Sequence, residues 1–172
     1  MFGLFKPKLA PQGPVEFQCD IEIAAPASEV YALINWADPR NAKRALGNEV
    51  TAVDGDEERY ELVLHNVPGH TFHIEVTHAV PNREYVFDCM VDPVIGDMQS
   101  TRETYRIEPV DEQSCVLTLI NETQFAEGLR MRKFQCHVGQ MAASSQSALE
   151  KLRIQAEFGL DALKSVEDRL VI

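Results

Sequence analysis

This sequence lacks the features that mark several large classes of protein. It has no run of about eighteen apolar residues, so we expect no integral membrane segment. Basic residues are scarce, 16 against 27 acidic ones, and the formal net charge is −11. A surface this acidic repels phosphate backbones, which argues against a nucleic-acid partner. With 45% apolar residues in a chain of 172, there is enough hydrophobic material for one domain with a sizeable core.

Export signals and paired cysteines are also missing. Residues 1–14 lack the apolar core of a signal peptide, and their three prolines predict a flexible arm. Phe2, Leu4 and Phe5 in this arm could instead touch a membrane surface or a partner. The cysteines are far apart and form no Cys-x-x-Cys pair: Cys19, Cys89, Cys115 and Cys136. We therefore expect reduced thiols in a cytoplasmic protein.

Motifs that carry catalysis or hold a cofactor are absent as well. There is no Gly-x-Ser-x-Gly, no phosphate-binding glycine loop and no His-Glu-x-x-His. His70, His73 and His78 lie close in sequence, but His73 and His78 point to opposite faces of a strand. Too few ligands converge to hold a metal ion. We expect no metal and no cofactor.

The longest segment without proline, residues 126–156, predicts one long helix. Apolar and small side chains recur in it at steps of three and four residues: Phe134, Val138, Met141, Ser145, Ala148 and Leu152. Gly159 is expected to end this helix, and the apolar residues within 157–172 form a second amphipathic stripe. We expect this tail helix to pack on its own domain; a homodimer contact or a lid is the alternative.

The region before the long helix alternates apolar and polar residues with a period of two. Residues 15–25 form the first such strand, and two short helices at about 26–35 and 38–46 follow it. Further strands are expected at 49–53, 59–66, 71–80, 84–91, 99–108 and 115–125. Because the turns are short, neighbouring strands should be antiparallel. The order predicts an α+β fold in which a curved antiparallel sheet of seven strands wraps around the long C-terminal helix.

The start of this pattern resembles a known superfamily. Residues 21–34 read IEIAAPASEVYALI, and the following loop is Asn35-Trp36-Ala37-Asp38. This resembles the START-like or Bet v 1-like (SRPBCC) superfamily, within it the polyketide cyclase/dehydrase and lipid-transport group, over about residues 15–156. The resemblance implies a helix-grip fold with a deep hydrophobic pocket for lipids, polyketides, quinones or similar molecules. The tail after Ala156 departs from the simple pattern.

Polar side chains on the expected inner faces are the candidates for chemistry. Glu103 and Tyr105 share one face of a strand, and His78 continues the inward face of another. In an apolar pocket such groups orient a ligand, and a buried Glu103 would have a raised pKa and could act as acid or base. Alternatively Glu103 lies at a solvated rim, a bulge changes the parity of its strand, and Tyr105 belongs to the core.

Aromatic and aliphatic side chains should line a cavity of about 300 Å³ or more. The expected wall consists of Trp36, Tyr60, Leu62, Phe72, Ile74, Tyr85, Phe87, Tyr105, Phe134, Val138 and Met141. The leading hypothesis is binding of a small hydrophobic molecule, such as a lipid, quinone or polyketide, between sheet and helix. One alternative is a cyclase or dehydratase in which His78, Glu103 or Tyr105 moves protons. Another is a co-chaperone-like interaction module that uses the acidic surface or the tail.

Overall fold

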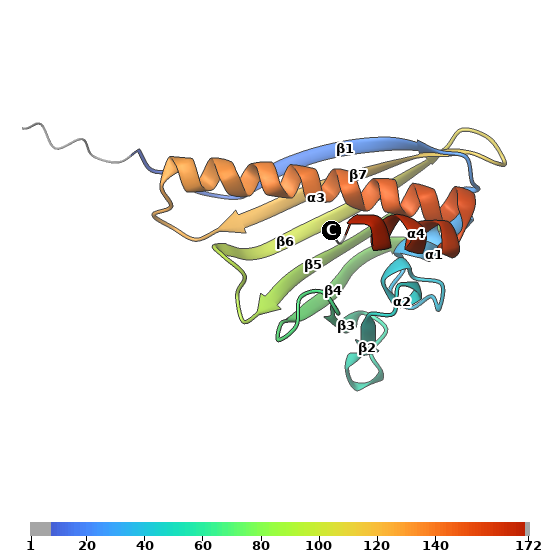
Figure 1. Cartoon of the computed structure of the whole chain (residues 1–172), viewed down its shortest axis with the longest axis horizontal. Helices are drawn as coiled ribbons and strands as arrows, with labels where there is room; N and C mark the ends of the chain where they lie inside the picture. Colours follow the sequence, from blue (N-terminus) through green and yellow to red (C-terminus); the bar gives the residue numbers. More distant parts are fainter. Residues whose placement is uncertain (1–7, 171–172) are drawn as a thin grey trace, which may run out of the picture.

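The computed structural model of the chain describes residues 8–170 (Figure 1). The strands are β1 (Val15–Ile23), β2 (Glu49–Ala52), β3 (Arg59–Val63), β4 (Thr71–Val80), β5 (Glu84–Asp92), β6 (Met98–Pro109) and β7 (Cys115–Phe125). The helices are α1 (Ala27–Ile34), α2 (Ala42–Ala45), the short 3₁₀ turn η1 (Val53–Gly55), α3 (Met131–Phe158) and α4 (Leu160–Leu170). Phe2, Leu4 and Phe5 lie outside the described residues.

All seven strands form one antiparallel sheet in the order β1-β7-β6-β5-β4-β3-β2. The short helices α1 and α2 follow β1, and α3 runs along β1 and β7 on one face of the sheet (Figure 1). This is the helix-grip arrangement that the sequence predicts. None of the helices in residues 8–170 combines the length and the apolar composition needed to cross a membrane.

The alternation in β7 explains why this strand lies at the centre of the core. Cys115, Leu117 and Leu119 point toward the helices and are at most 1% exposed. The intervening residues are only half-buried on the other face. Further along the same inner face the side chains become polar, and Thr123 donates a hydrogen bond to Oδ1 of Asn121 at 2.8 Å. A buried polar pair of this kind is tolerated because its members satisfy each other.

Helix α3 begins later than the sequence predicts, at Met131 instead of about Ala126. Residues 126–130 form a turn, in which the backbone N–H of Ala126 donates to the carbonyl of Asp97 and Gly128 adopts a φ of +74°. The expected stripe also differs in detail. The fully buried position of the helix is Leu149, which that stripe omits, whereas Phe134, Val138 and Met141 are only half-buried. The C-terminal half of α3 therefore packs more tightly than its N-terminal half.

Both ends of the described chain are attached to the domain. Leu9 pairs with Arg130, and the backbone N–H of Ala10 donates to the carbonyl of Leu129 at 2.8 Å, so residues 8–10 are not part of a loose arm. At the other end Gly159, with a φ of +85°, separates α3 from α4. Leu163 of α4 is fully buried, which means that the tail helix packs on its own chain. A homodimer contact through the tail stays a prediction.

Candidate functional site

A band of polar side chains crosses the otherwise apolar inner face of the sheet. Thr101, Glu103 and Tyr105 come from β6, and Asn121 and Thr123 come from β7. The strand register sets Glu103 opposite Asn121 and Thr101 opposite Thr123. Thr101, Tyr105, Asn121 and Thr123 are all at least 91% buried. Polar groups at this depth, on a surface that is mainly hydrophobic, are the usual means by which a protein orients a bound molecule.

The hydroxyl of Tyr105 donates a hydrogen bond to Oε2 of Glu103 at 3.0 Å. Burial raises the pKa of the Glu103 carboxyl, and this effect outweighs the hydrogen bond from Tyr105 and the positive charge of Lys43, which lower it. Burial and the adjacent Glu103 also raise the pKa of Tyr105 well above its usual value. Tyr105 therefore keeps its proton and donates, and Glu103 is the member of the pair that gives up its proton more readily.

His78 does not belong to this inner face. The pairing of β4 with β5 shifts at a bulge between Val76 and His78, and a bulge reverses the parity of the residues that follow it. The side chain of His78 is 54% exposed, with its Nε2 atom 3.5 Å from Oε2 of Glu84. The prediction that His78 continues the inward face of β4 is therefore wrong.

The cavity between the helices and the sheet is small. It measures about 70 Å³, well below the 300 Å³ that the sequence analysis expects. Its lining includes Trp36, Phe87 and Tyr105 of the expected wall, together with Lys43 of α2 and Leu163 of α4. Leu163 packs into the space that a ligand would need, so the tail helix is one reason for the small volume.

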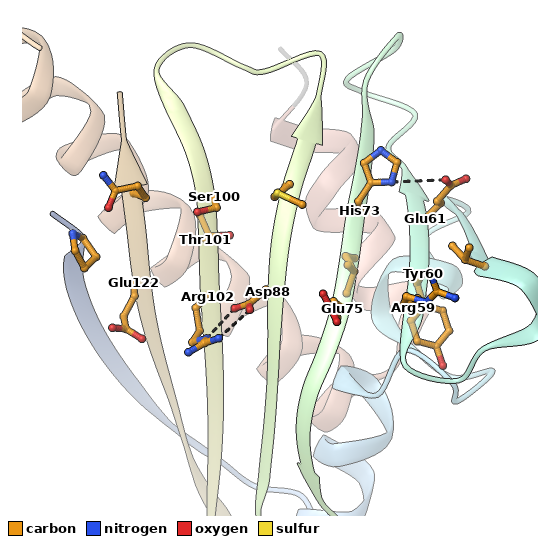
Figure 2. Close-up of a pocket in the computed structure, with 15 residues that line it drawn as sticks. Arg59, Tyr60, Glu61, His73, Glu75, Asp88, Ser100, Thr101, Arg102 and Glu122 are labelled. Atoms are coloured by element: carbon orange, nitrogen blue, oxygen red, sulfur yellow. Dashed lines mark hydrogen bonds and ion pairs between the residues drawn. The ribbon is translucent and has the colours of Figure 1, made fainter. Parts of the chain in front are cut away.

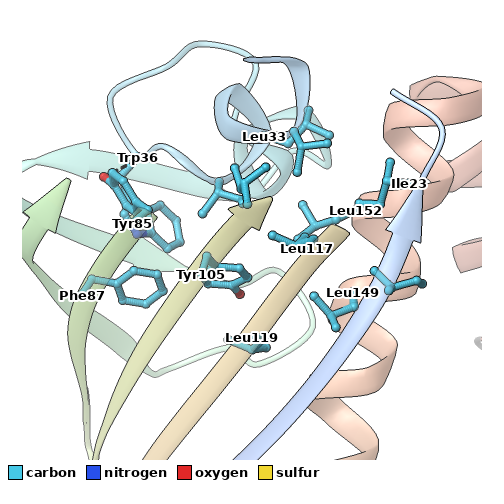
Figure 3. Packing of buried hydrophobic residues seen from close by; sticks show 14 of the residues in the cluster. Ile23, Leu33, Trp36, Tyr85, Phe87, Tyr105, Leu117, Leu119, Leu149 and Leu152 are labelled. Atoms are coloured by element: carbon cyan, nitrogen blue, oxygen red, sulfur yellow. Dashed lines mark hydrogen bonds between the residues drawn. The ribbon is translucent and has the colours of Figure 1, made fainter. Parts of the chain in front are cut away.

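The remaining wall residues fall into two groups. Tyr60, Leu62, Ile74 and Tyr85 are buried in the same core without lining the inner cavity, whereas Phe72, Phe134, Val138 and Met141 are half-buried. Figure 3 shows Trp36, Tyr85, Phe87 and Tyr105 close together on the inner side. The ring centroids of Trp36 and Phe87 are 5.5 Å apart, and those of Phe87 and Tyr105 are 6.1 Å apart. These rings make a continuous aromatic surface beside the cavity.

Lys43 is one of the site residues that the sequence analysis missed. It lies in α2, a helix of 4 residues whose N-terminus is capped by Asn41. The Asn41 side chain accepts hydrogen bonds from the backbone N–H groups of Lys43 and Arg44, and it donates to the carbonyl of Ile34 at 3.1 Å. An asparagine two residues before a basic pair is a helix-capping signal, but it does not indicate that the lysine points inward.

A hollow larger than the inner cavity lies on the opposite face of the sheet and measures about 580 Å³. Figure 2 shows its charged lining, with the helices behind the sheet. Arg102 donates two hydrogen bonds to Asp88, at 2.7 and 2.8 Å, and Nδ1 of His73 lies 3.6 Å from Oε1 of Glu61. Because these charged side chains are partly exposed and pair with one another, the hollow is a solvated, polar surface of the twisted sheet that is poorly suited to an apolar ligand.

Comparison with known proteins identifies a family for this chain. Residues 14–164 match the family described as polyketide cyclase/dehydrase and lipid transport. No curated protein matches the sequence.

Solved structures with the same fold share little sequence with this chain. DynU16, from the dynemicin biosynthetic locus, is 18% identical with a TM-score of 0.60, over 84% of this chain and 48% of its own. The di-domain ARO/CYC protein BexL, from the BE-7585A biosynthetic pathway, is 18% identical with a TM-score of 0.67, over 81% and 45%. A START superfamily protein from Mycobacterium smegmatis is 16% identical with a TM-score of 0.57, over 83% and 99%. The chain thus spans about half the length of the first two, and the likeness concerns the fold.

Proposed function

The chain belongs to the polyketide cyclase/dehydrase and lipid transport family, and from that premise we propose that it binds a small hydrophobic molecule between the sheet and α3. Lipids, quinones and polyketide-like compounds are the candidate classes. The observation that carries the proposal is the composition of the inner face, where an aromatic surface around Phe87 is interrupted only by a few polar groups such as Glu103. Ligand pockets have this composition.

Incomplete coverage by α3 supports the same proposal. Phe134, Val138 and Met141 on the N-terminal half of the helix are half-buried, and so are Cys89 of β5 and Glu103 of β6, two strands that α3 does not cover. A helix packed only to complete a core would bury its own apolar positions fully. The inner cavity is too small for a drug-sized molecule as it stands. Binding of such a molecule therefore requires α3 or α4 to move outward.

The chain offers a built-in probe for ligand entry. Trp36 is its only tryptophan, and it lines the inner cavity. We expect a ligand from a panel of fatty acids, quinones and aromatic polyketides to change Trp36 fluorescence and to raise the melting temperature together. At a hundred times its Kd, such a ligand adds about 2.7 kcal/mol of stability. A panel that changes neither signal would overturn the proposal.

A matched pair of variants locates the site. Ala148 lines the inner cavity from α3, whereas Ala143 of the same helix is exposed. Ala148→Phe should fill the cavity and weaken binding at least tenfold, and Ala143→Phe should leave the Kd unchanged. Equal effects of the two substitutions would place binding outside the inner cavity.

A specific observation also favours a second candidate, an enzyme of the cyclase or dehydratase type. The half-buried Glu103 carboxyl has a raised pKa and is held by Tyr105, which suits a general acid. In such an enzyme Glu103→Gln should leave ligand binding intact and slow turnover by roughly a hundredfold or more. In a carrier the same substitution should change binding little, and no product should form with either protein.

A further inference from the structure

Two ammonium groups line the mainly apolar inner cavity, Lys43 of α2 and Lys151 of α3. Lys151 forms an ion pair with Glu167 of α4. Lys43 has no carboxylate within ion-pair distance in residues 8–167, whose side chains the structure describes. In a chain with 27 acidic residues, Lys43 needs an explanation, because it lines a mainly apolar cavity and has no carboxylate within ion-pair distance among these residues.

The surroundings of Lys43 are those of an interior group that water can still reach. Its side chain keeps exposed surface, yet protein surrounds the ammonium closely enough that burial lowers its pKa. The negative charges of Glu103 and Glu167 offset this effect only in part, and the positive charge of Lys151 adds to it. An anion placed beside Lys43 would stabilise its charged form.

The backbone that carries Lys43 is held on both sides. Asn41 is 2% exposed, and its amide group joins the end of α1 to the start of α2 through Ile34 and Lys43. Arg44 donates to the carbonyl of Trp36 at 3.1 Å and to that of Val50 at 2.6 Å. The backbone of Lys43 is therefore fixed before any ligand arrives, which reduces the ordering that binding requires.

A second residue that lines the cavity, Trp36, has a donor that also lacks a partner. Trp36 is 5% exposed, and its indole Nε1–H is buried without a hydrogen-bond acceptor in the described part of the chain. Most buried donors are paired, because an unpaired one loses its bond to water and gains nothing in return. Oxygen atoms of a ligand that enters beside Trp36 can supply the missing acceptor.

We propose that the cavity takes an amphipathic organic acid, whose apolar body packs on Phe87 and Leu152 and whose ionised oxygen pairs with Lys43. The inference rests on the proposed ligand-binding function and names the ligand class. The indole N–H of Trp36 is the second donor to the acid group. A neutral lipid of the same shape would bury the same apolar area but leave Lys43 without a counter-charge.

The test compares an acid with its neutral amide of nearly identical shape. The probes are 2-naphthylacetate with 2-naphthylacetamide and decanoate with decanamide, titrated by calorimetry and by Trp36 fluorescence at pH 7.5. We expect the wild type to bind each acid at least about tenfold more tightly than its amide. Lys43→Met should abolish this preference without changing the affinity for the amide. Lys164→Met, at an exposed position of α4, is the matched control and should keep the preference.

The outcomes separate the inference from the function on which it rests. Equal binding of acid and amide to the wild type, with a Trp36 response to both, overturns the acidic ligand class and leaves hydrophobic binding intact. A preference that survives Lys43→Met overturns the role of Lys43. If no probe binds, both proposals fail for these ligands. A measurement without any variant completes the test: the carboxyl pKa of ¹³C-labelled decanoate should fall on binding, and an unchanged or raised value contradicts pairing with Lys43.

Discussion

Tyr105 and Glu103, two residues apart on β6, share a hydrogen bond of 3.0 Å on the inner face of the sheet. Side chains at this spacing lie on the same face of a strand, so the pair needs no long-range contact to form. What the tertiary structure adds is burial, which raises the pKa of Glu103 and makes the pair sensitive to pH.

Glu103→Gln should change how stability depends on pH. The folded protein binds the Glu103 proton more tightly than the unfolded chain does, so the stabilisation is complete below about pH 4.5 and is lost as the pH rises through the raised pKa. The glutamine cannot ionise and still accepts from Tyr105. We expect the variant to become the more stable protein toward neutral pH, as measured by urea unfolding from pH 4 to 8. A stability difference that does not vary over this range would contradict a raised pKa of the Glu103 carboxyl.

Asp97→Asn should weaken the contact between the loop that precedes β6 and the first turns of α3. Asp97 accepts a hydrogen bond from Lys133 at 2.5 Å, and its carboxylate lies 2.8 Å from Nε2 of His137. Both partners lower the pKa of Asp97, and Lys133 has the larger effect. This stabilisation is present above the usual pKa of 3.8 and is lost as the pH falls through the lowered value. The melting temperature of the variant should therefore be lower at pH 7, and the gap should close in acid. The same gap at pH 7 and pH 2.5 would refute the assignment.

Tyr85→Phe should cost about 1–2 kcal/mol of unfolding free energy. The backbone N–H of Trp36 donates to the hydroxyl of Tyr85 at 3.2 Å in the buried interior, and phenylalanine leaves this donor unpaired. Tyr31 provides the control, because its ring packs edge-on against Tyr85 at 5.8 Å and its hydroxyl makes no hydrogen bond among the described residues. Tyr31→Phe should stay within about 0.5 kcal/mol of the wild type. Denaturant unfolding of the two variants measures the difference.

Two alanine substitutions test the uneven packing of α3. Leu149 is fully buried, so Leu149→Ala should cost roughly 2–5 kcal/mol. Val138 is half-buried in a separate apolar cluster around Phe125 and Leu129, and Val138→Ala should cost clearly less. Urea unfolding with unchanged m-values is the measurement. If both variants lose the same stability, the N-terminal half of the helix packs as tightly as the C-terminal half.

Some features of the candidate site were predictable and others were not, and β4 and β6 show the difference. The alternation in β6 correctly placed Glu103 and Tyr105 on the inner face. The same rule failed for His78, because a bulge after Val76 inserts one residue into β4. Nothing in the residues 71–80 marks the bulge, since it arises from the way β4 bends against β5.

The sequence by itself determined the order of the elements, the antiparallel sheet and the inward polar pair of β6. These follow from period-two alternation and turn residues, which act between near neighbours in the chain. Only the tertiary structure decided the volume of the inner cavity, the entry of Lys43 into it and the half of α3 that is buried. The physical reason is that each depends on how α2 packs over one sheet with α3 and α4, from which it is distant in sequence, and the space left between packed layers is not encoded at any single position.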